Sequence, residues 1–180
     1  MKPWSQFEKH IESVNQFYRV KGFGVVEKIP NGTKTIRQGG RQIIVRDTKT
    51  GCDFIGHLDG TPIAFDCKLT ANKTNFPFGS GKVVTVKPHQ KAFLKDFKKS
   101  GGQAFFLIAL ENARRVFLVD IDSYMTIEQE MLLNKRKSIP IARLEQYEVD
   151  QATGIIDYRR NILEYLKRKE AIIIGAKKED

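Results

Sequence analysis

The sequence has only two cysteines in 180 residues, Cys52 and Cys67, and they lack the paired spacing of a metal-binding motif. It therefore predicts neither a disulfide framework nor a cysteine-ligated zinc site, and both thiols are expected as small buried groups. No apolar run approaches the roughly 20 residues that a membrane-spanning helix needs. The first twelve residues also lack the hydrophobic stretch of a signal peptide. We therefore expect a soluble, cytoplasmic protein with no membrane partner.

Acidic residues are outnumbered by basic ones: 21 Asp and Glu stand against 31 Lys and Arg, which gives a net charge of +10. Such an excess favours a polyanionic partner, either nucleic acid or an anionic membrane surface. Ordinary solubility is the alternative explanation, because many basic proteins bind no nucleic acid. The charge therefore suggests a class of partner, and sequence motifs are needed to identify that partner.

Patterns of hydrophobic residues predict one domain of the α/β (α+β) class that spans the whole chain, residues 1–180. Ile11, Val14 and Tyr18 recur at helical spacing, which indicates an amphipathic first helix. The run at 104–110 is apolar throughout, as in a central strand covered on both faces. The expected helices are 4–18, 88–102, 123–134 and 158–171, and the expected strands are 22–29, 43–47, 52–58, 62–69, 104–110 and 115–121.

A basic, glycine-rich arm of about residues 28–50 is expected within this domain. Its first part, 30–42, reads as a mobile loop because it combines glycines with cations and has no apolar periodicity. The cations there that could contact phosphate are Lys34, Arg37 and Arg41.

The stretch around Phe65 reads as a buried strand, yet it contains Asp66 and Lys68. Burying a lone charge is unfavourable, and lysine is almost never fully buried unless it is paired. Because alternate residues of a strand share a face, Asp66 and Lys68 should point the same way. The Asp59-Gly60 pair is a strong hairpin turn signal, and that hairpin would bring Asp53 beside Asp66.

Two carboxylates and an amine that converge in this way can support phosphodiester hydrolysis. Asp53 and Asp66 would hold Mg²⁺, a hard cation that takes oxygen ligands and keeps several waters. Lys68 would orient or deprotonate the attacking water, or stabilise charge at the phosphate. The spacing alone leaves an alternative open, a surface hairpin whose exposed Asp–Lys pair contributes less than about 1 kcal/mol.

Further motifs accompany this trio over most of the chain. They are FEKHIESVNQFY at 7–18, CDFIGHLDGTPIAFDCKLTANKTNFPF at 52–78, PHQKAFLKDFKKSGGQAFFLI at 88–108 and IDYRRNILEYL at 156–166. Together they resemble the RecU-type Holliday junction resolvases of the PD-(D/E)xK nuclease superfamily. The first segment resembles the family's E-x₆-N-x₂-Y helix, the second its D-Y-x-G and E-A-K blocks, and the third its H-Q motif.

This resemblance implies a restriction-endonuclease-like fold, with a mixed central sheet flanked by helices. It implies a homodimeric, Mg²⁺-dependent endonuclease, with Mn²⁺ as a substitute, that nicks four-way DNA junctions in recombination and repair. The resemblance assigns catalytic roles to Asp53, Asp66, Lys68, Glu8 and Gln90. Asp53, Asp66 and Glu8 are the corresponding metal ligands, and the arm is expected to enter the centre of the junction.

The sequence also departs from the family pattern at several positions. Asp66 replaces the usual Glu, which shortens the reach of that carboxylate by one methylene. Gly51 and Cys52 replace two hydroxyl residues that could contact phosphate. The arm is shorter and richer in glycine, which bears on the strictness of junction selectivity.

Other cations are candidates for phosphate contacts that position a duplex without reading its sequence: Lys73, Lys82, Lys87 and Lys91. Two further functions remain open at this point. A restriction-type or flap-type nuclease would share every catalytic residue and differ only in substrate. A non-catalytic DNA-binding protein on the same fold is less favoured, since a degenerate site would be expected to lose one of the trio.

Overall fold

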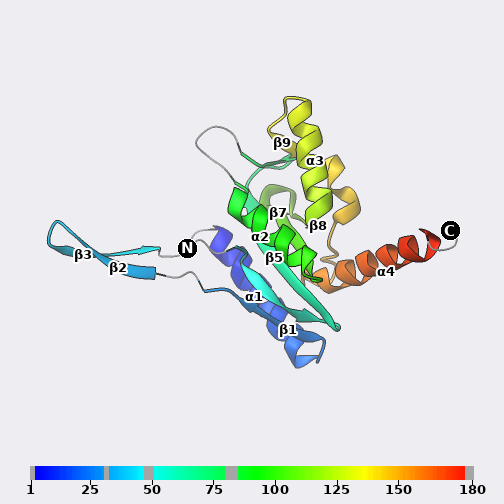
Figure 1. Ribbon diagram of the computed structural model, residues 1–180, viewed down its shortest axis with the longest axis horizontal. Helices are drawn as coiled ribbons and strands as arrows, with labels where there is room; N and C mark the ends of the chain where they lie inside the picture. The colour runs from blue at the N-terminus through cyan, green and yellow to red at the C-terminus, as the bar shows by residue number, and fades with distance from the viewer. Residues whose placement is uncertain (1–2, 31–32, 47–50, 80–84, 177–180) are drawn as a thin grey trace.

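The structure is a computed structural model that describes residues 3–30, 33–46, 51–79 and 85–176 (Figure 1). The helices are α1 (Pro3–Val20), α2 (Pro88–Lys99), α3 (Ile121–Leu133) and α4 (Tyr158–Ala176). The strands are β1 (Gly24–Lys28), β2 (Thr33–Gln38), β3 (Arg41–Arg46), β4 (Phe54–Leu58), β5 (Thr61–Thr70), β6 (Asn75–Pro77), β7 (Gln103–Leu110), β8 (Arg115–Asp120) and β9 (Ser138–Pro140).

A five-stranded sheet in the order β1-β4-β5-β7-β8 forms the centre of the molecule. Its pairs are antiparallel except for β5 and β7, which run parallel. A parallel pair needs a crossover connection, and α2 lies within it. The expected class is therefore confirmed: a mixed central sheet is flanked by helices.

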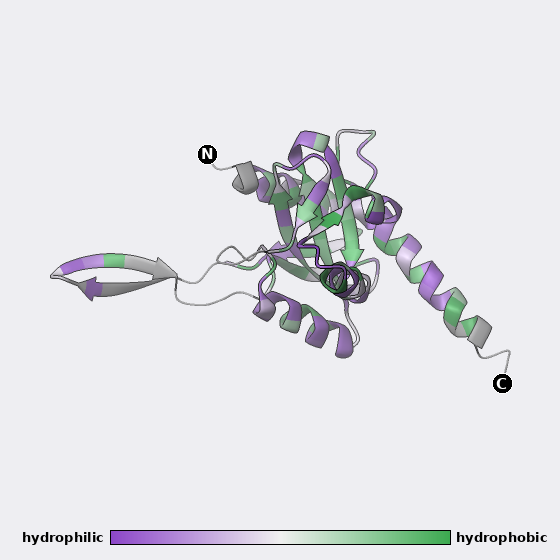
Figure 2. Cartoon of the chain, turned by 90° about the horizontal axis from the view of Figure 1, so that it is seen from above, coloured by the Kyte–Doolittle hydropathy of each residue, from purple (hydrophilic) through white to green (hydrophobic). Residues whose placement is uncertain are grey.

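Each face of the sheet buries its own hydrophobic cluster. α2 and α3 cover one face, where Leu94 and Tyr124 pack against Phe106. α1 and α4 cover the other, where Ile11 and Tyr158 pack in the same cluster as Phe65. Figure 2 shows the sheet largely in the hydrophobic colour while the helices turn hydrophilic sides outward. The strand β7 is buried along its whole length between these layers, as its unbroken apolar run predicts.

Local sequence explains where the expected helices begin and end. Pro88 occupies the first turn of α2, where a missing N–H costs nothing, and Gly101 follows its end with φ of 101°. In α3, the Asp120 side chain accepts a hydrogen bond from the Ser123 amide and caps the first turn. The capping residue lies before the apolar periodicity begins, so α3 starts two residues earlier than predicted.

The expectation of a loop at 30–42 is wrong. The arm is an antiparallel hairpin of β2 and β3, with Thr33 opposite Arg46 and a turn at Gly39-Gly40. Both glycines have positive φ, 59° and 75°, as a tight two-residue hairpin turn requires. The arm stands away from the body (Figures 1 and 2). The strand expected at 43–47 is confirmed in β3, whose apolar run at 43–45 is visible in the sequence, whereas β2 has a single apolar residue, Ile36, and gave no strand signal.

A second, two-stranded sheet of β6 and β9 was also missed, since each strand is only three residues long. It buries Phe76 and Ile139. α4 extends from the body on the side opposite the arm (Figure 1). Among the helices that are described, none has the length and apolarity needed to cross a membrane.

Candidate nuclease site

The β4–β5 hairpin brings the two predicted carboxylates to one place. Its tip is the Asp59-Gly60 turn, with φ of 48° and 78°, and Phe54 pairs with Phe65 at its other end. Beyond that pair, the Cys67 amide donates a 2.8 Å hydrogen bond to Asp53 Oδ2. The predicted approach of Asp53 to the Asp66–Lys68 segment is therefore confirmed.

Asp66, Lys68 and Gln90 form a closed set of contacts. Lys68 Nζ lies 2.6 Å from Asp66 Oδ2 and donates a 2.9 Å hydrogen bond to Gln90 Oε1. Gln90 Nε2 donates to Asp66 Oδ1 at 2.6 Å. Gln90 Oε1 also accepts from the Lys87 amide at the start of α2, which fixes the amide plane. The charged pair within an apolar strand is thus buried against α2, with Asp66 0% exposed.

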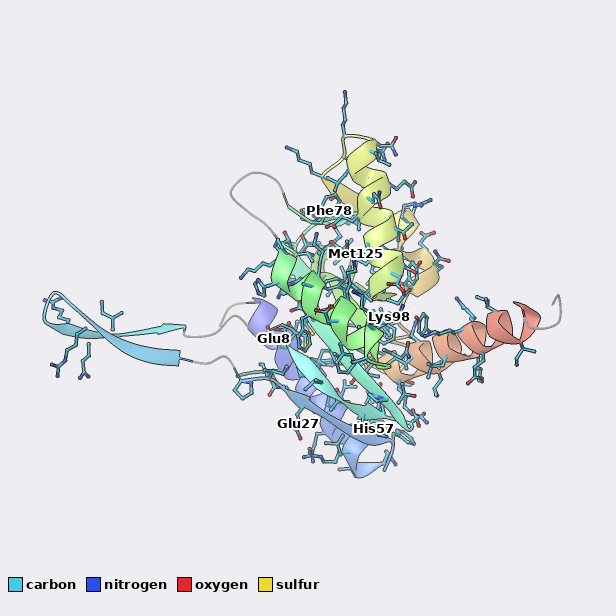
Figure 3. The ribbon with its side chains drawn as sticks, viewed as in Figure 1. Glu8, Glu27, His57, Phe78, Lys98 and Met125 are labelled. Atoms are coloured by element: carbon cyan, nitrogen blue, oxygen red, sulfur yellow. The ribbon has the colours of Figure 1, made fainter. Side chains whose placement is uncertain are left out.

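Glu8 reaches the same region from α1. It is buried, and Glu8, Cys67 and Lys68 share the lining of an open cavity of about 200 Å³. Its Oε2 atom is 2.9 Å from Lys28 Nζ, and the same ammonium lies 2.6 Å from Glu12 Oε1. Glu8 lies at the side of the body where the arm begins (Figure 3). The family resemblance assigned Glu8 to the site, but the sequence did not identify Lys28, which pairs with both Glu8 and Glu12.

Burial makes the charged form of these carboxyl groups unfavourable. Burial, followed by the negative charge of Asp53, raises the pKa of Asp66 to about 7, although Lys68 opposes the shift. The pKa of Asp53 is also raised, by burial and by Glu8, against the hydrogen bond from the Cys67 amide. Asp53 and Glu8 thus act electrostatically on Asp66, and Lys68 only partly offsets their effect on its pKa.

A divalent cation fits this donor set. Asp66 Oδ2 is buried with the Lys68 ammonium 2.6 Å away, and that single cation only partly offsets the effects of burial and of the Asp53 charge. Among the described residues, no group of three or more His, Cys, Asp and Glu side chains is already placed to hold a metal. Mg²⁺ does not require such a cage, because it binds through one or two carboxylates and keeps water and phosphate ligands. Asp53 and Asp66 supply that minimum.

Comparison with known proteins identifies the family of this chain. The family model described as "RecU: Recombination protein U" matches residues 4–168. The chain belongs to the RecU family. A protein named Holliday junction resolvase RecU from Shouchella clausii is 28% identical over 86% of this chain and 76% of its own length. One of the same name from Pediococcus pentosaceus is 25% identical over 92% of this chain and 82% of its own length.

Other RecU motif residues join distant segments rather than forming the site. Tyr158 donates a hydrogen bond to Asn15, and Tyr18 donates one to Asp157 at 2.8 Å. The ring of Tyr158 also lies 5.1 Å from that of Phe65 on the site's own strand. The first-helix motif and the I-D-Y motif thus meet directly behind β5. Sequence reasoning noted both motifs but had no signal that they pair.

The substituted pair before Asp53 has a packing explanation in this RecU chain. A side chain at Gly51 would meet the ring of Phe93, whose nearest atom is 2.2 Å from the added carbon. Cys52 is fully buried and donates a weak hydrogen bond from its thiol to the Phe54 carbonyl. These two positions therefore pack against α2 and the core.

The predicted phosphate contacts lie in different settings. Arg37, Arg41, Lys73 and Lys87 are exposed. Lys91 instead lies 2.7 Å from Glu128 and is mostly covered, so its charge is already paired. The backbone of Lys34 lies in β2 of the arm, and Lys82 lies outside the described residues.

Proposed function

We propose that this RecU family member is a Mg²⁺-dependent endonuclease that resolves four-way DNA junctions as a homodimer. The single observation that carries the proposal is the cluster of Asp53, Asp66, Lys68 and Gln90, where a buried and a half-buried carboxylate converge with a fixed lysine. The names of its relatives, Holliday junction resolvase RecU, support the junction as substrate.

In this proposal Asp53 and Asp66 hold Mg²⁺, with Glu8 beside them, and Mn²⁺ can replace it. Held there, the ion would supply Lewis acidity for a phosphoryl oxygen and for the attacking water. Lys68 and Gln90 act as one unit: Gln90 accepts from Lys68 and donates to Asp66, which holds the ammonium beside the metal site. From there Lys68 orients the attacking water or stabilises the charge that develops on the phosphate.

The surface and the arm supply DNA contacts. The net charge of +10 favours binding to a polyanion, and Lys73 and Lys87 are exposed near the site. Arg37 and Arg41 lie on the hairpin arm, which extends beyond the body and can enter the centre of a junction. A homodimer with two-fold symmetry suits a junction that must be cut at two matched positions.

A cleavage assay with Mg²⁺ tests this function on a synthetic four-way junction, a linear duplex, a flap and single-stranded DNA, with Asp66→Asn as the inactive control. We expect paired nicks in the junction, with 5′-phosphate and 3′-hydroxyl ends, that the variant does not make. Equal cutting of every substrate would leave a nuclease without junction selectivity. Tight binding with no cutting in Mg²⁺ or Mn²⁺ would contradict the proposal.

The contribution of the arm can be separated from the chemistry. Replacement of residues 33–46 by a short Gly-Ser linker should reduce the preference for a junction over linear duplex while leaving the catalytic cluster intact. An unchanged preference would mean that the arm does not select the substrate.

A further inference from the structure

Lys28 occupies a position that no catalytic role yet explains. It is the last residue of β1, immediately before the chain leaves the body for the arm. Its ammonium contacts two carboxylates on α1, Glu8 Oε2 at 2.9 Å and Glu12 Oε1 at 2.6 Å. One cation therefore serves two acceptors that are separated by one helical turn.

The two acceptors differ in their surroundings. The Glu8 side chain is 10% exposed and acts electrostatically on both Asp53 and Asp66, whereas that of Glu12 is 44% exposed. Lys28 is 33% exposed and lies between them. Glu8 thus borders the metal site and Glu12 faces solvent.

The backbone ties Lys28 to the same site. Lys28 pairs with Phe54, the residue after Asp53, in the β1–β4 register. The next residue, Ile29, donates its amide to the Asp53 carbonyl at 2.8 Å. The base of the arm is therefore held against both Glu8 and the strand that positions Asp53.

We propose that Lys28 is a positioning residue that holds Glu8 in the metal-free protein and shifts to Glu12 when Glu8 turns toward a bound divalent cation. The inference rests on the proposed function, because it assigns the metal to the Asp53 and Asp66 site.

The physical reason is charge balance in a poorly solvated place. Without a metal, Lys28 compensates a carboxylate that would otherwise repel Asp53 and Asp66. A bound cation takes over that compensation, and Lys28 then needs another acceptor, because a buried or half-buried charge left unpaired is unfavourable. Glu12 already lies within contact distance, so the shift requires no rearrangement of the backbone.

Calorimetric titration of Mn²⁺ into the DNA-free protein tests the shift without using activity. The variants are Glu12→Gln, Lys28→Met, their combination, and Lys28→Arg alone and with Glu12→Gln. Glu27→Gln is the matched control, because Glu27 is an exposed carboxylate on β1 that pairs with Arg19 instead. Asp66→Asn shows whether the bound ion occupies the proposed site.

We expect Glu12→Gln to weaken Mn²⁺ binding about fivefold, because Lys28 then has only Glu8. In the Lys28→Met background, Glu12→Gln should weaken Mn²⁺ binding no more than the control Glu27→Gln does. In the Lys28→Arg background, Glu12→Gln should still cause the fivefold loss. Thermal melts check that each variant is folded.

An equal loss from Glu12→Gln in both backgrounds would show a simple charge effect and overturn the inference. It would leave the proposed function intact. Conversely, Mn²⁺ binding with the expected non-additivity, in a protein that cuts no DNA, would support the role of Lys28 and reject the nuclease. Wild-type protein that binds no Mn²⁺ would overturn both.

Discussion

Two buried carboxylates, Asp66 and Glu128, are served by consecutive residues of α2. Gln90 bonds to Asp66, and Lys91 lies 2.7 Å from Glu128. Glu128 is satisfied at both oxygens, since the Tyr124 hydroxyl donates to the other at 3.1 Å. Asp66 also has a contact at each oxygen, from Gln90 and from Lys68 at 2.6 Å, but the charges of Asp53 and Glu8 act against its own.

Glu128 therefore holds the fold, whereas Asp66 suits the metal-binding role proposed for it. A buried carboxylate whose charge is matched by its donors rigidifies a structure, whereas carboxylates that repel one another are unfavourable unless further positive charge joins them. Glu128 joins α3 to α2 through its contacts with Lys91 and Tyr124. Asp66 is arranged for a positive charge that the chain itself only partly supplies.

The largest expected effect is on cleavage. Asp66→Asn should lower the rate of junction cutting at least about 100-fold, because it removes a proposed metal ligand worth several kcal/mol to the transition state. Glu128→Gln should cut within about twofold of wild type at a temperature where it stays folded. Measurement of single-turnover rates with Mg²⁺ compares the two; comparable losses in both would erase the distinction.

The paired lysines sharpen the contrast. Lys68→Ala should lower the cleavage rate by a similar factor, about 100-fold. The variant should still bind junction DNA. Lys91→Ala should leave the rate largely unchanged, since its ammonium is bound to Glu128 rather than to the site. Gel-shift and cleavage assays on both proteins test this. Cutting by Lys68→Ala at the wild-type rate would remove Lys68 from the mechanism.

Stability should respond in the opposite order. Glu128→Gln removes one partner of a mostly buried pair and should lower the free energy of unfolding by about 1–3 kcal/mol. Asp66→Asn should leave the metal-free protein at least as stable, because it relieves repulsion with Asp53 and Glu8. Urea titrations of both variants provide the comparison, and a marked destabilisation by Asp66→Asn would contradict it.

The smallest expected effect is a pH dependence of the metal-free protein. Asp66 ionises near pH 4 when unfolded, but its pKa is about 7 in the fold, so the folded state binds more protons between these values. Its contribution to stability is therefore present below about pH 4 and is lost as the pH rises toward 7. The free energy of unfolding of the Asp66→Asn variant, measured by urea titration at several pH values, should decline less over this interval than that of the wild type. An identical decline would show that Asp66 is not the group responsible.

The sequence predicted the β4–β5 hairpin and its charged residues because their signals are local. The Asp59-Gly60 turn fixes the register, and the two-residue spacing of Asp66 and Lys68 fixes the shared face. The placement of Gln90 and Glu8 required the family resemblance, since both come from other elements. The helices and the long strands were found because a buried face imposes periodicity on their residues.

What the sequence did not reveal depends on contacts without such periodicity. Only one strand of the arm hairpin was recognised, at 43–47, because its partner β2 has a single apolar residue, Ile36, and read as a loop. Lys28 looked like an ordinary surface cation until its two partners on α1 were placed beside it. The Tyr158–Asn15 bond joins residues 143 positions apart, beyond the reach of local patterns.

The bond between Ile29 and Asp53 has a consequence for how this chain can change in evolution. Because β1 and β4 are antiparallel neighbours, the arm is an insertion into what would otherwise be one hairpin, and its two ends meet at a fixed point on the body. Lengthening such an excursion costs little, only about 0.6 kcal/mol for each doubling of a flexible loop. Arms of different length can therefore be exchanged at this point of the body, and under the proposed function the DNA shapes that bind would change while Asp53, Asp66 and Lys68 stay in place.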